Sequence, residues 1–308
     1  MTTRGPLLLL DAASLYYRAF FGDRGKILAP DGSPVGAVRG FLDMIAYLVR
    51  ERRPSGLVAC WDDDWRPEFR VAALPSYKAH RVAADGGEDA PPELGPQVDL
   101  IVDVLAALGI ARVGAAGCEA DDVIGTLTTR ALAADATTTV EIATGDRDLF
   151  QLVSPRVRVL YTARGVRNLD VIDEPRLAER YGVASGDAYA DLAVLRGDAS
   201  DGLPGVAGIG EKTGAGLLAR FGTLAGVVAA ADDPGSDLSA GQRAKLLAGA
   251  EYLAVAPGVV RVLRDADLPE ADPELPGEPR DAAALAALSS RWGLGSSVTR
   301  LRAALTAG

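Results

Sequence analysis

The sequence predicts an α/β fold, a parallel sheet flanked by helices, on three observations. Short apolar runs alternate with segments of helical spacing through residues 1–160, the pattern of strands joined by crossover helices. Three of these runs lead directly into aspartates, namely Asp11, Asp62 and Asp146. With 308 residues, 48% of them hydrophobic, the chain is also long enough to bury a sizeable core.

The elements follow in order along the chain. The expected strands are residues 7–10, 56–61, 110–113, 140–143 and 157–161, and the expected helices are residues 38–49, 98–108 and 120–132. A Gly-, Pro- and acid-rich stretch at residues 83–97 predicts a mobile excursion. Residues 187–260 lose the strand pattern and predict a small helical subdomain. Residues 266–282 then predict a surface loop, and residues 282–305 a helical tail broken at Gly293–Gly295.

Composition excludes several classes of protein. Two cysteines and one histidine argue against a disulfide scaffold and against a Cys/His zinc site. No apolar run approaches the length of a membrane span, and no secretory signal is visible, so we expect a cytoplasmic protein without a membrane partner. The formal net charge of −10 taken alone argues against a nucleic-acid partner. Such a charge is a poor guide, however, when the acids are clustered.

The acids stand at turn-forming positions beside apolar elements. Besides Asp11 and the run Asp62–Asp64, they lie in three motifs: Glu119, Asp121 and Asp122 in GCEADDVIG, Asp146 and Asp148 in TGDRDLF, and Asp198 and Asp201 in RGDASDGLPG. Any one pair is more simply a helix cap. Buried together without cations, however, these groups would repel one another strongly. The pattern therefore favours an oxygen-lined site for Mg²⁺ or Mn²⁺, and two such ions can hydrolyse a phosphodiester.

Two further segments suggest contacts with phosphates. The stretch GVAGIGEKTG, Gly205 to Gly214, has the helix-hairpin-helix pattern, whose backbone N–H groups can grip DNA without reading bases; an ordinary glycine-rich turn is the simpler alternative. Residues 65–82 are locally basic, with Arg66, Arg70, Lys78 and Arg81 interleaved with aromatics. An amphipathic helix with a solvated face would give the same composition.

The sequence resembles the bacterial 5′ nuclease family of 5′–3′ exonucleases and flap endonucleases, which also forms the N-terminal domain of bacterial DNA polymerase I. The resemblance spans nearly the whole chain and is weakest after residue 265. It is most specific in CEADDVIGTL (118–127), TGDRDLFQLV (144–153) and GDASDGLPGVAGIGEKTG (197–214). The chain has no room for a polymerase and is similar to stand-alone members.

The resemblance implies a PIN-like (resolvase-like) domain over residues 1–186 with a helical arch at 65–97, a helix-hairpin-helix (helix–three-turn–helix) subdomain at 187–260, and a segment at 261–308 that packs back on the nuclease domain. It implies two divalent ions held among Asp11, Asp62, Glu119, Asp121, Asp122, Asp146, Asp148, Asp198 and Asp201. Asp121 would bridge the ions, with Asp11 and Asp62 nearer the first and Asp146, Asp148 and Asp201 nearer the second.

By the same resemblance, Arg70, Lys78 and Arg81 would steer the scissile phosphate and stabilise its developing charge. The implied DNA-binding residues are Gly205, Val206, Gly208, Ile209, Gly210, Lys212 and Thr213, with K⁺ bound by carbonyls near Val206 and Ile209. Three departures from the family pattern are Ala12 and Gly202, where Gly and Asn are usual, and a loop after Trp61 that is one residue longer, so that Asp63 could replace Asp62.

The function that follows is a structure-dependent 5′ nuclease that acts on 5′ flaps and 5′ ends of duplex, including RNA–DNA primer junctions, in replication and repair. We expect a monomer. Two alternatives are a non-catalytic DNA-binding module of the same fold, disfavoured by the complete acid set, and a PIN-type ribonuclease, which is generally shorter and lacks Gly205–Gly214.

Overall fold

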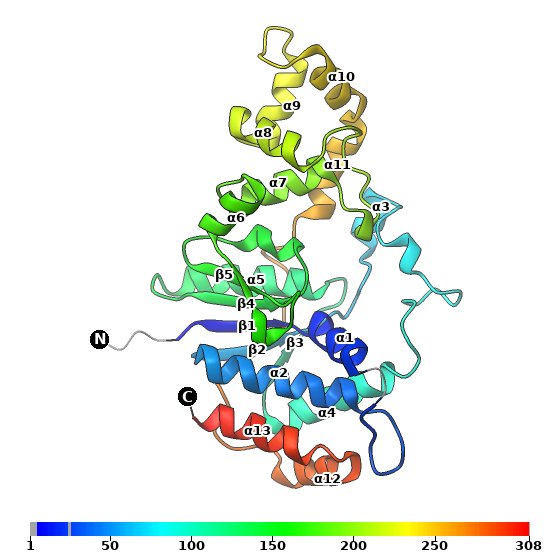
Figure 1. The fold of residues 1–308 in the computed structure, drawn as a ribbon, viewed down its shortest axis with the longest axis vertical. Coiled ribbons are helices and arrows are strands. Elements are labelled where there is room, and N and C mark those ends of the chain that lie inside the picture. Colours follow the sequence, from blue (N-terminus) through cyan, green and yellow to red (C-terminus); the bar gives the residue numbers. More distant parts are fainter. Residues whose placement is uncertain (1–4, 24–25, 308) are drawn as a thin grey trace.

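A mixed six-stranded sheet forms the centre of the computed structural model, which describes residues 5–23 and 26–307 (Figure 1). The strand order is β3-β2-β1-β4-β5-β6. The bounds are β1 (Leu7–Asp11), β2 (Gly56–Cys60), β3 (Ala111–Val113), β4 (Val140–Thr144), β5 (Val157–Tyr161) and β6 (Asp170–Ile172). The first five strands are parallel, as the sequence predicts, and β6 pairs antiparallel to β5.

Helices cover both faces of the sheet, which explains why its central strands are apolar at nearly every position. Leu8 and Leu10 of β1 belong to one core cluster and Leu9 to the other, because successive side chains of a strand point to opposite faces. The first cluster lies under α1 (Ala12–Asp23), α2 (Gly36–Arg52) and α4 (Gly95–Leu108). The second lies under α5 (Ala120–Ala134), α6 (Glu174–Tyr181) and α7 (Gly186–Arg196).

A helical subdomain stands beyond α7, at the top of Figure 1. It contains α8 (Glu211–Phe221), α9 (Leu224–Asp232), α10 (Ala240–Ala248) and α11 (Ala250–Val260). Within the described part of the chain, no single helix is long and apolar enough to cross a membrane. The bent pair α8 and α9 passes that test only when the two are taken together, by length and composition alone.

The last part of the chain returns to the sheet domain. Residues 261–281 form an extended connection whose Pro273 carbonyl accepts a hydrogen bond from Leu57 N at the start of β2, at 2.7 Å. Two helices follow, α12 (Ala282–Trp292) and α13 (Gly295–Thr306), and they pack on α4 and α2. Gly293 ends α12 with a φ of 65°, so the predicted break in the tail is confirmed.

Three elements were not predicted from the sequence, namely α1, β6 and α6, and of these α1 lines the acid-rich cavity. Helix α1 follows Asp11 without any turn, and the apolar residues on its outer face hide its buried stripe, which consists of Ala12, Leu15, Tyr16 and Ala19. Strand β6 has only three residues and no alternation to mark it. The arch region is less helical than expected: it holds α3 (Glu68–Ala73) and one 3₁₀ turn, η1 (Ala79–Arg81), followed by loop up to α4.

Candidate active site

Carboxylates gather at the carboxyl edge of the sheet, where parallel strands end side by side. Asp11 is the last residue of β1, and Asp62 and Asp146 lie two residues beyond β2 and β4. All three line one cavity of about 220 Å³, together with Glu119 and Asp121 at the start of α5. Lys78 and Arg81 line the same cavity from the arch. The structure therefore brings together seven of the predicted site residues.

Short hydrogen bonds fix the strand-end carboxylates. Thr144 Oγ1 donates to Asp11 Oδ2 at 2.6 Å and accepts from Asp146 N at 2.8 Å, so one hydroxyl links the ends of β1 and β4. Ser14 N donates to Asp11 Oδ1 at 3.0 Å. Ala120 N donates to Asp62 Oδ1 at 2.6 Å, which ties the end of β2 to the start of α5. Thr144 was not among the predicted site residues, although it directly precedes Gly145 in the TGDRDLF motif.

A second, much smaller cavity lies behind the first and contains Asp148 and Asp201. Asp121 and Glu119 line both cavities. Both residues therefore lie between the two groups, and the bridging role that the resemblance implies for Asp121 stays a prediction. The order in which the other acids would divide between two ions stays a prediction.

Burial and mutual repulsion make these carboxylates hard to ionise together. Burial raises the pKa of Asp11 to about 7, with Asp62 and Asp146 adding to the rise and the Thr144 hydrogen bond opposing it. Burial, followed by repulsion from Asp146, raises the pKa values of Asp121 and Asp148 well above their ordinary range. A cluster of this kind is stabilised by cations, whether side chains or metal ions.

The side-chain cations at the cavity are already paired with acids. Lys78 Nζ donates to Glu119 Oε2 at 2.5 Å, and Tyr77 Oη donates to Glu119 Oε1 at 2.7 Å. Burial opposes the charge on Lys78, but Glu119 and Asp201 outweigh it and raise its pKa. Arg81 Nη2 donates to Asp201 Oδ1 and to the Ser200 carbonyl, both at 2.7 Å. Both cations thus lie beside the acids, at the cavity wall, as predicted.

Arg70 and Asp122 are a correction to the predicted site. Neither lines the cavity of about 220 Å³, although Arg70 lines the small cavity behind it, beside Asp148 and Asp201. Arg70 is 2% exposed, and its two Nη atoms donate to the two oxygens of Asp122 at 2.7 and 2.6 Å. Leu263 N donates to Asp122 Oδ1 at 2.8 Å and Glu119 N to Oδ2 at 3.1 Å. With both oxygens in use, Asp122 has no lone pair directed at a metal, and Arg70 is too enclosed to steer a phosphate.

Two other acids are placed by the structure outside the cavity walls. Asp198 precedes the short turn η4 (Ala199–Asp201), accepts a 2.9 Å hydrogen bond from Ser200 N, and lies 3.6 Å from Arg147. Asp63 pairs with Arg112 at 3.4 Å instead of lining the cavity. The open choice between Asp62 and Asp63 therefore falls to Asp62.

The glycine-rich stretch Gly205–Gly214 forms the entry to α8. Gly205 and Gly208 have φ values of 66° and 77°, which side chains other than glycine rarely adopt. Val206 and Ile209 are buried, whereas Lys212 and Thr213 are exposed on the first turn of α8 after the N-cap residue Gly210. Lys245 Nζ donates to the Gly208 carbonyl at 3.0 Å. The expected pair of short helices is thus α7 and α8, with η4 in a longer connection between them.

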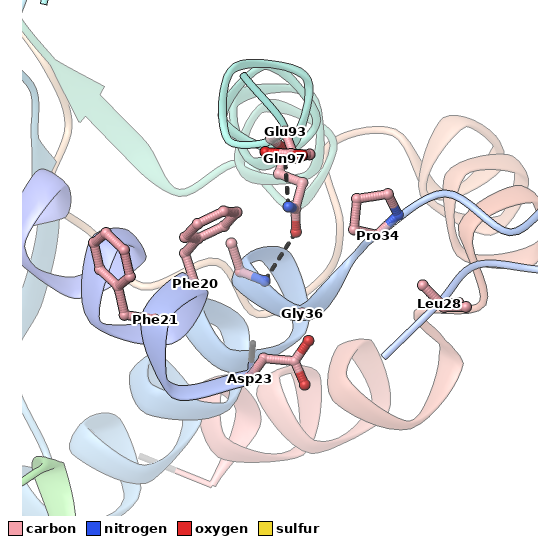
Figure 2. A pocket seen from close by; sticks show the side chains of 9 residues that line it. Phe20, Phe21, Asp23, Leu28, Pro34, Gly36, Glu93 and Gln97 are labelled. Atoms are coloured by element: carbon pink, nitrogen blue, oxygen red, sulfur yellow. Dashed lines mark hydrogen bonds between the residues drawn. The ribbon is translucent and has the colours of Figure 1, made fainter. Parts of the chain in front are cut away.

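A larger cavity, about 410 Å³, lies between the end of α1, the start of α2 and α4, and it has a different chemistry (Figure 2). The cavity is lined by the apolar residues Phe20, Phe21, Leu28 and Pro34. Gln97 of α4 also lines it and accepts a hydrogen bond from Ala37 N of α2 at 2.9 Å. Its acidic lining residues, Asp23 and Glu93, stand without a basic partner among the lining side chains. The cavity of about 410 Å³ thus lacks the combination of acids and cations that lines the acid-rich cavity of about 220 Å³.

The donor chemistry of that acid-rich cavity fits hard divalent cations. Its negatively charged potential ligands are carboxylate oxygens, which Mg²⁺ and Mn²⁺ prefer, and their mutual repulsion would be relieved by a bound cation. Across residues 5–23 and 26–307, no three His, Cys, Asp or Glu side chains are already drawn together in the geometry of a metal site. The carboxylates are instead spread around the cavity wall.

Two family models match the chain: the N-terminal resolvase-like domain of 5′–3′ exonucleases over residues 6–182, and their C-terminal SAM fold over residues 184–283. The chain belongs to the 5′–3′ exonuclease family. A 5′–3′ exonuclease of Streptomyces coelicolor is 59% identical over 97% of this chain and 100% of its own length. One from Mycobacterium tuberculosis is 49% identical over 98% of each chain. The sequence prediction of a nuclease of this family is confirmed.

Solved structures support the same fold at low sequence identity. The T5 D15 protein co-crystallised with metal ions has a TM-score of 0.64 at 17% identity, over 97% of this chain and 99% of its own. The catalytic core of Rad2 in complex with a DNA substrate has a TM-score of 0.58 at 17% identity, over 97% and 92%. The predicted α/β domain with a helical second domain is therefore confirmed.

Proposed function

We propose that this 5′–3′ exonuclease is a structure-dependent 5′ nuclease that cleaves 5′ flaps near the junction with duplex and trims 5′ ends, leaving a 5′-phosphate and a 3′-hydroxyl. The observation that carries this proposal is the cavity in which Asp11, Asp62 and Asp121 face Lys78 and Arg81. Acids alone would repel a phosphodiester, and cations alone would hold it without hydrolysing it. A scissile phosphate needs both.

Asp11, Asp62, Asp121 and Asp146, with Asp148 and Asp201 behind them, would hold two divalent ions, Mg²⁺ or Mn²⁺. When bound, such ions activate water and stabilise the leaving oxygen of the phosphodiester. The protein's own residues position the substrate. Lys78 and Arg81 attract the phosphate toward the acids, and Thr144 keeps the carboxylates of β1 and β4 in register.

The duplex part of the substrate would lie against Gly205–Gly214. Backbone N–H groups at the start of α8, beside the exposed Lys212 and Thr213, suit a DNA backbone and carry no sequence preference. K⁺ bound by carbonyls near Val206 and Ile209 is part of the same proposal. Lys245 already supplies a positive charge at the neighbouring Gly208 carbonyl, so we expect the dependence on K⁺ to be modest.

In the cell, we propose that the enzyme works as a cytoplasmic monomer on displaced flaps and on RNA–DNA primer junctions. Two alternatives remain testable: a DNA-binding module without catalysis, and a ribonuclease. Flap DNA, a matched flap with an RNA 5′ strand, and a single-stranded RNA distinguish all three by which of them are cleaved.

The decisive experiment is cleavage of a labelled 5′ flap in Mg²⁺, in Mn²⁺, in Ca²⁺ and in excess chelator. We expect cleavage in Mg²⁺ and Mn²⁺, little in Ca²⁺ because its looser coordination positions water poorly, and none in chelator. A rise in melting temperature with Mg²⁺ should accompany cleavage, since a ligand of the folded state stabilises it. Undiminished cleavage in chelator would refute the two-metal proposal, and binding without cleavage in every metal would favour the non-catalytic module.

A further inference from the structure

The loop between η1 and α4 begins with a tight hairpin at residues 82–89. Val82 pairs with Glu88 in an antiparallel bridge, and Ala83 N donates to the Gly87 carbonyl at 2.8 Å. Asp89 N donates to the Arg81 carbonyl, also at 2.8 Å. Gly86 makes the turn with a φ of 88°. The hairpin therefore joins Arg81 directly to the strand that carries Glu88.

Glu88 is the residue of this hairpin that reaches the acid-rich cavity. It is half-buried there, and its carboxylate interacts with the Tyr17 hydroxyl of α1, which lines the same cavity. The positive charges of Lys78 and Arg81 attract it, while Asp62 repels it. A loop has thus placed a carboxylate at a cavity of acids, against repulsion, with two cations and one hydroxyl on the same cavity wall.

No motif that indicates a nuclease contains Glu88, and none of the roles assigned above uses it. Its sequence neighbours, Asp85 and Asp89, are exposed and do not line the cavity. An acid that served only solubility would be exposed, as Asp85 and Asp89 are. The position of Glu88 at the cavity wall therefore indicates a function at the cavity itself.

We propose that Glu88 screens Lys78 and Arg81 from DNA in the DNA-free enzyme. Its carboxylate lines the same cavity as these two cations, whose ion pairs go to Glu119 and Asp201, and its interaction with Tyr17 keeps the hairpin beside α1. An entering phosphate meets this negative charge and must move it aside. This inference rests on the proposed function, because it assumes that Lys78 and Arg81 receive a phosphate.

The charge of Glu88 should weaken the affinity for every DNA substrate by the same factor. The effect on cleavage then depends on how tightly each substrate binds through its other contacts. A flap offers its duplex to Gly205–Gly214, so it binds tightly in spite of Glu88. A bare single strand lacks that second contact. At a DNA concentration that saturates with flap but not with single strand, loss of Glu88 therefore raises cleavage of the single strand selectively.

The test is Glu88→Gln compared with Asp89→Asn, which removes the same charge from the same hairpin at an exposed position. Binding of fluorescent flap is measured in chelator, where no cleavage occurs, across a series of salt concentrations. We expect Glu88→Gln to bind about fivefold more tightly than Asp89→Asn at low salt, the effect of one charge contact in water, and the difference to shrink as salt rises. In Mg²⁺, the flap concentration at half-maximal single-turnover rate should fall by the same factor.

Tyr17→Phe tests the tether in a double-mutant cycle. Tyr17→Phe alone should give part of the increase in flap affinity that Glu88→Gln gives, because the hairpin loses its contact with α1. In the E88Q background, Tyr17→Phe should give no further increase. Independent effects of the two substitutions would overturn the proposal. So would equal affinities of E88Q and D89N, or a lower maximal rate at unchanged half-saturation, which would place Glu88 in the chemistry. If the wild type fails to bind flap at all, the proposed function fails instead.

Discussion

Arg70 and Lys78 come from the same short segment, and both approach the start of α5, yet their surroundings differ. Arg70 donates to both oxygens of Asp122, and its Nε donates to the Val259 carbonyl at the end of α11, at 3.0 Å. Lys78 donates to Glu119 and lines the acid-rich cavity of about 220 Å³. Arg70 lies 3.5 Å from Glu119 and lines only the small cavity behind it. The Arg70–Asp122 pair is therefore closed toward the acid-rich cavity, whereas the Lys78–Glu119 pair is open to it.

This difference in surroundings distinguishes a cation that stabilises the fold from one that can contact the substrate. In the closed pair, the guanidinium joins the arch, α5 and α11, because its partners come from all three. Breaking such a pair leaves an uncompensated buried charge, so its loss should appear first in the free energy of unfolding. In the open pairs, each cation keeps room to exchange its acid for a phosphate. Position in a motif does not distinguish these cases, but the count of satisfied donors and acceptors does.

The largest expected effect separates Asp148 from Asp122. Asp148→Asn should lower flap cleavage in Mg²⁺ by orders of magnitude, because the ion site loses a charge. It should leave the melting temperature unchanged or higher, since Asp146 and Asp201 repel the native carboxylate. Asp122→Asn should do the opposite: the folded protein cleaves, but the free energy of unfolding falls by about 3–5 kcal/mol as Arg70 loses its partner.

Flap binding in chelator provides the control for that pair. Asp148→Asn should bind no more weakly than the wild type, and we expect somewhat tighter binding, because a neutral amide repels phosphate less than a carboxylate does. Near-normal cleavage by this variant would remove Asp148 from the site. Loss of cleavage by well-folded Asp122→Asn would mean that the closed pair also serves the reaction.

The next effect compares the two cations themselves. Lys78→Ala should lower the single-turnover rate by ~10²–10³ with a smaller change in affinity, the usual result of losing one electrostatic contact to a developing charge. Arg70→Lys keeps a charge but cannot form the two-pronged contact with Asp122. It should lower the free energy of unfolding by about 1.5–3 kcal/mol and leave the rate of the folded enzyme near that of the wild type. If Lys78→Ala binds flap more weakly but keeps a normal single-turnover rate, Lys78 holds the phosphate and does not stabilise the transition state.

The sequence predicts the sheet and the acids at its edge because both are local signals. Each parallel strand is a short, mostly apolar run, and Asp11, Asp62 and Asp146 lie at the strand ends or at most two residues beyond them. Nothing local marks the partners of Asp122, because Arg70, Leu263 and Val259 are brought together by the return of the chain after α11. The prediction that Asp122 binds metal failed for that reason. The approach of Glu88 to Tyr17 is equally non-local and could not be anticipated.

The smallest effect applies the same comparison to two glycines of the Gly205–Gly214 segment. Gly208 is closed: its φ is 77°, and a Cβ there would lie 2.9 Å from the Lys245 ammonium. Gly210 is open: its φ is −88°, and a Cβ would meet nothing within 4 Å. Gly208→Val should therefore destabilise the fold, by about 1–3 kcal/mol for an unfavourable backbone conformation.

Gly210→Val, by contrast, should fold normally and place its bulk outward, where duplex DNA would approach the first turn of α8. We expect binding of duplex-containing flaps in chelator to weaken about fivefold, the worth of one backbone hydrogen bond of ~1 kcal/mol, and binding of a bare single strand to stay unchanged. The comparison uses Gly210→Val and Gly216→Val, since Gly216 is also free of neighbours within 4 Å but lies in the middle of α8. If both variants weaken flap and single strand equally, the start of α8 supports the fold and does not hold the duplex.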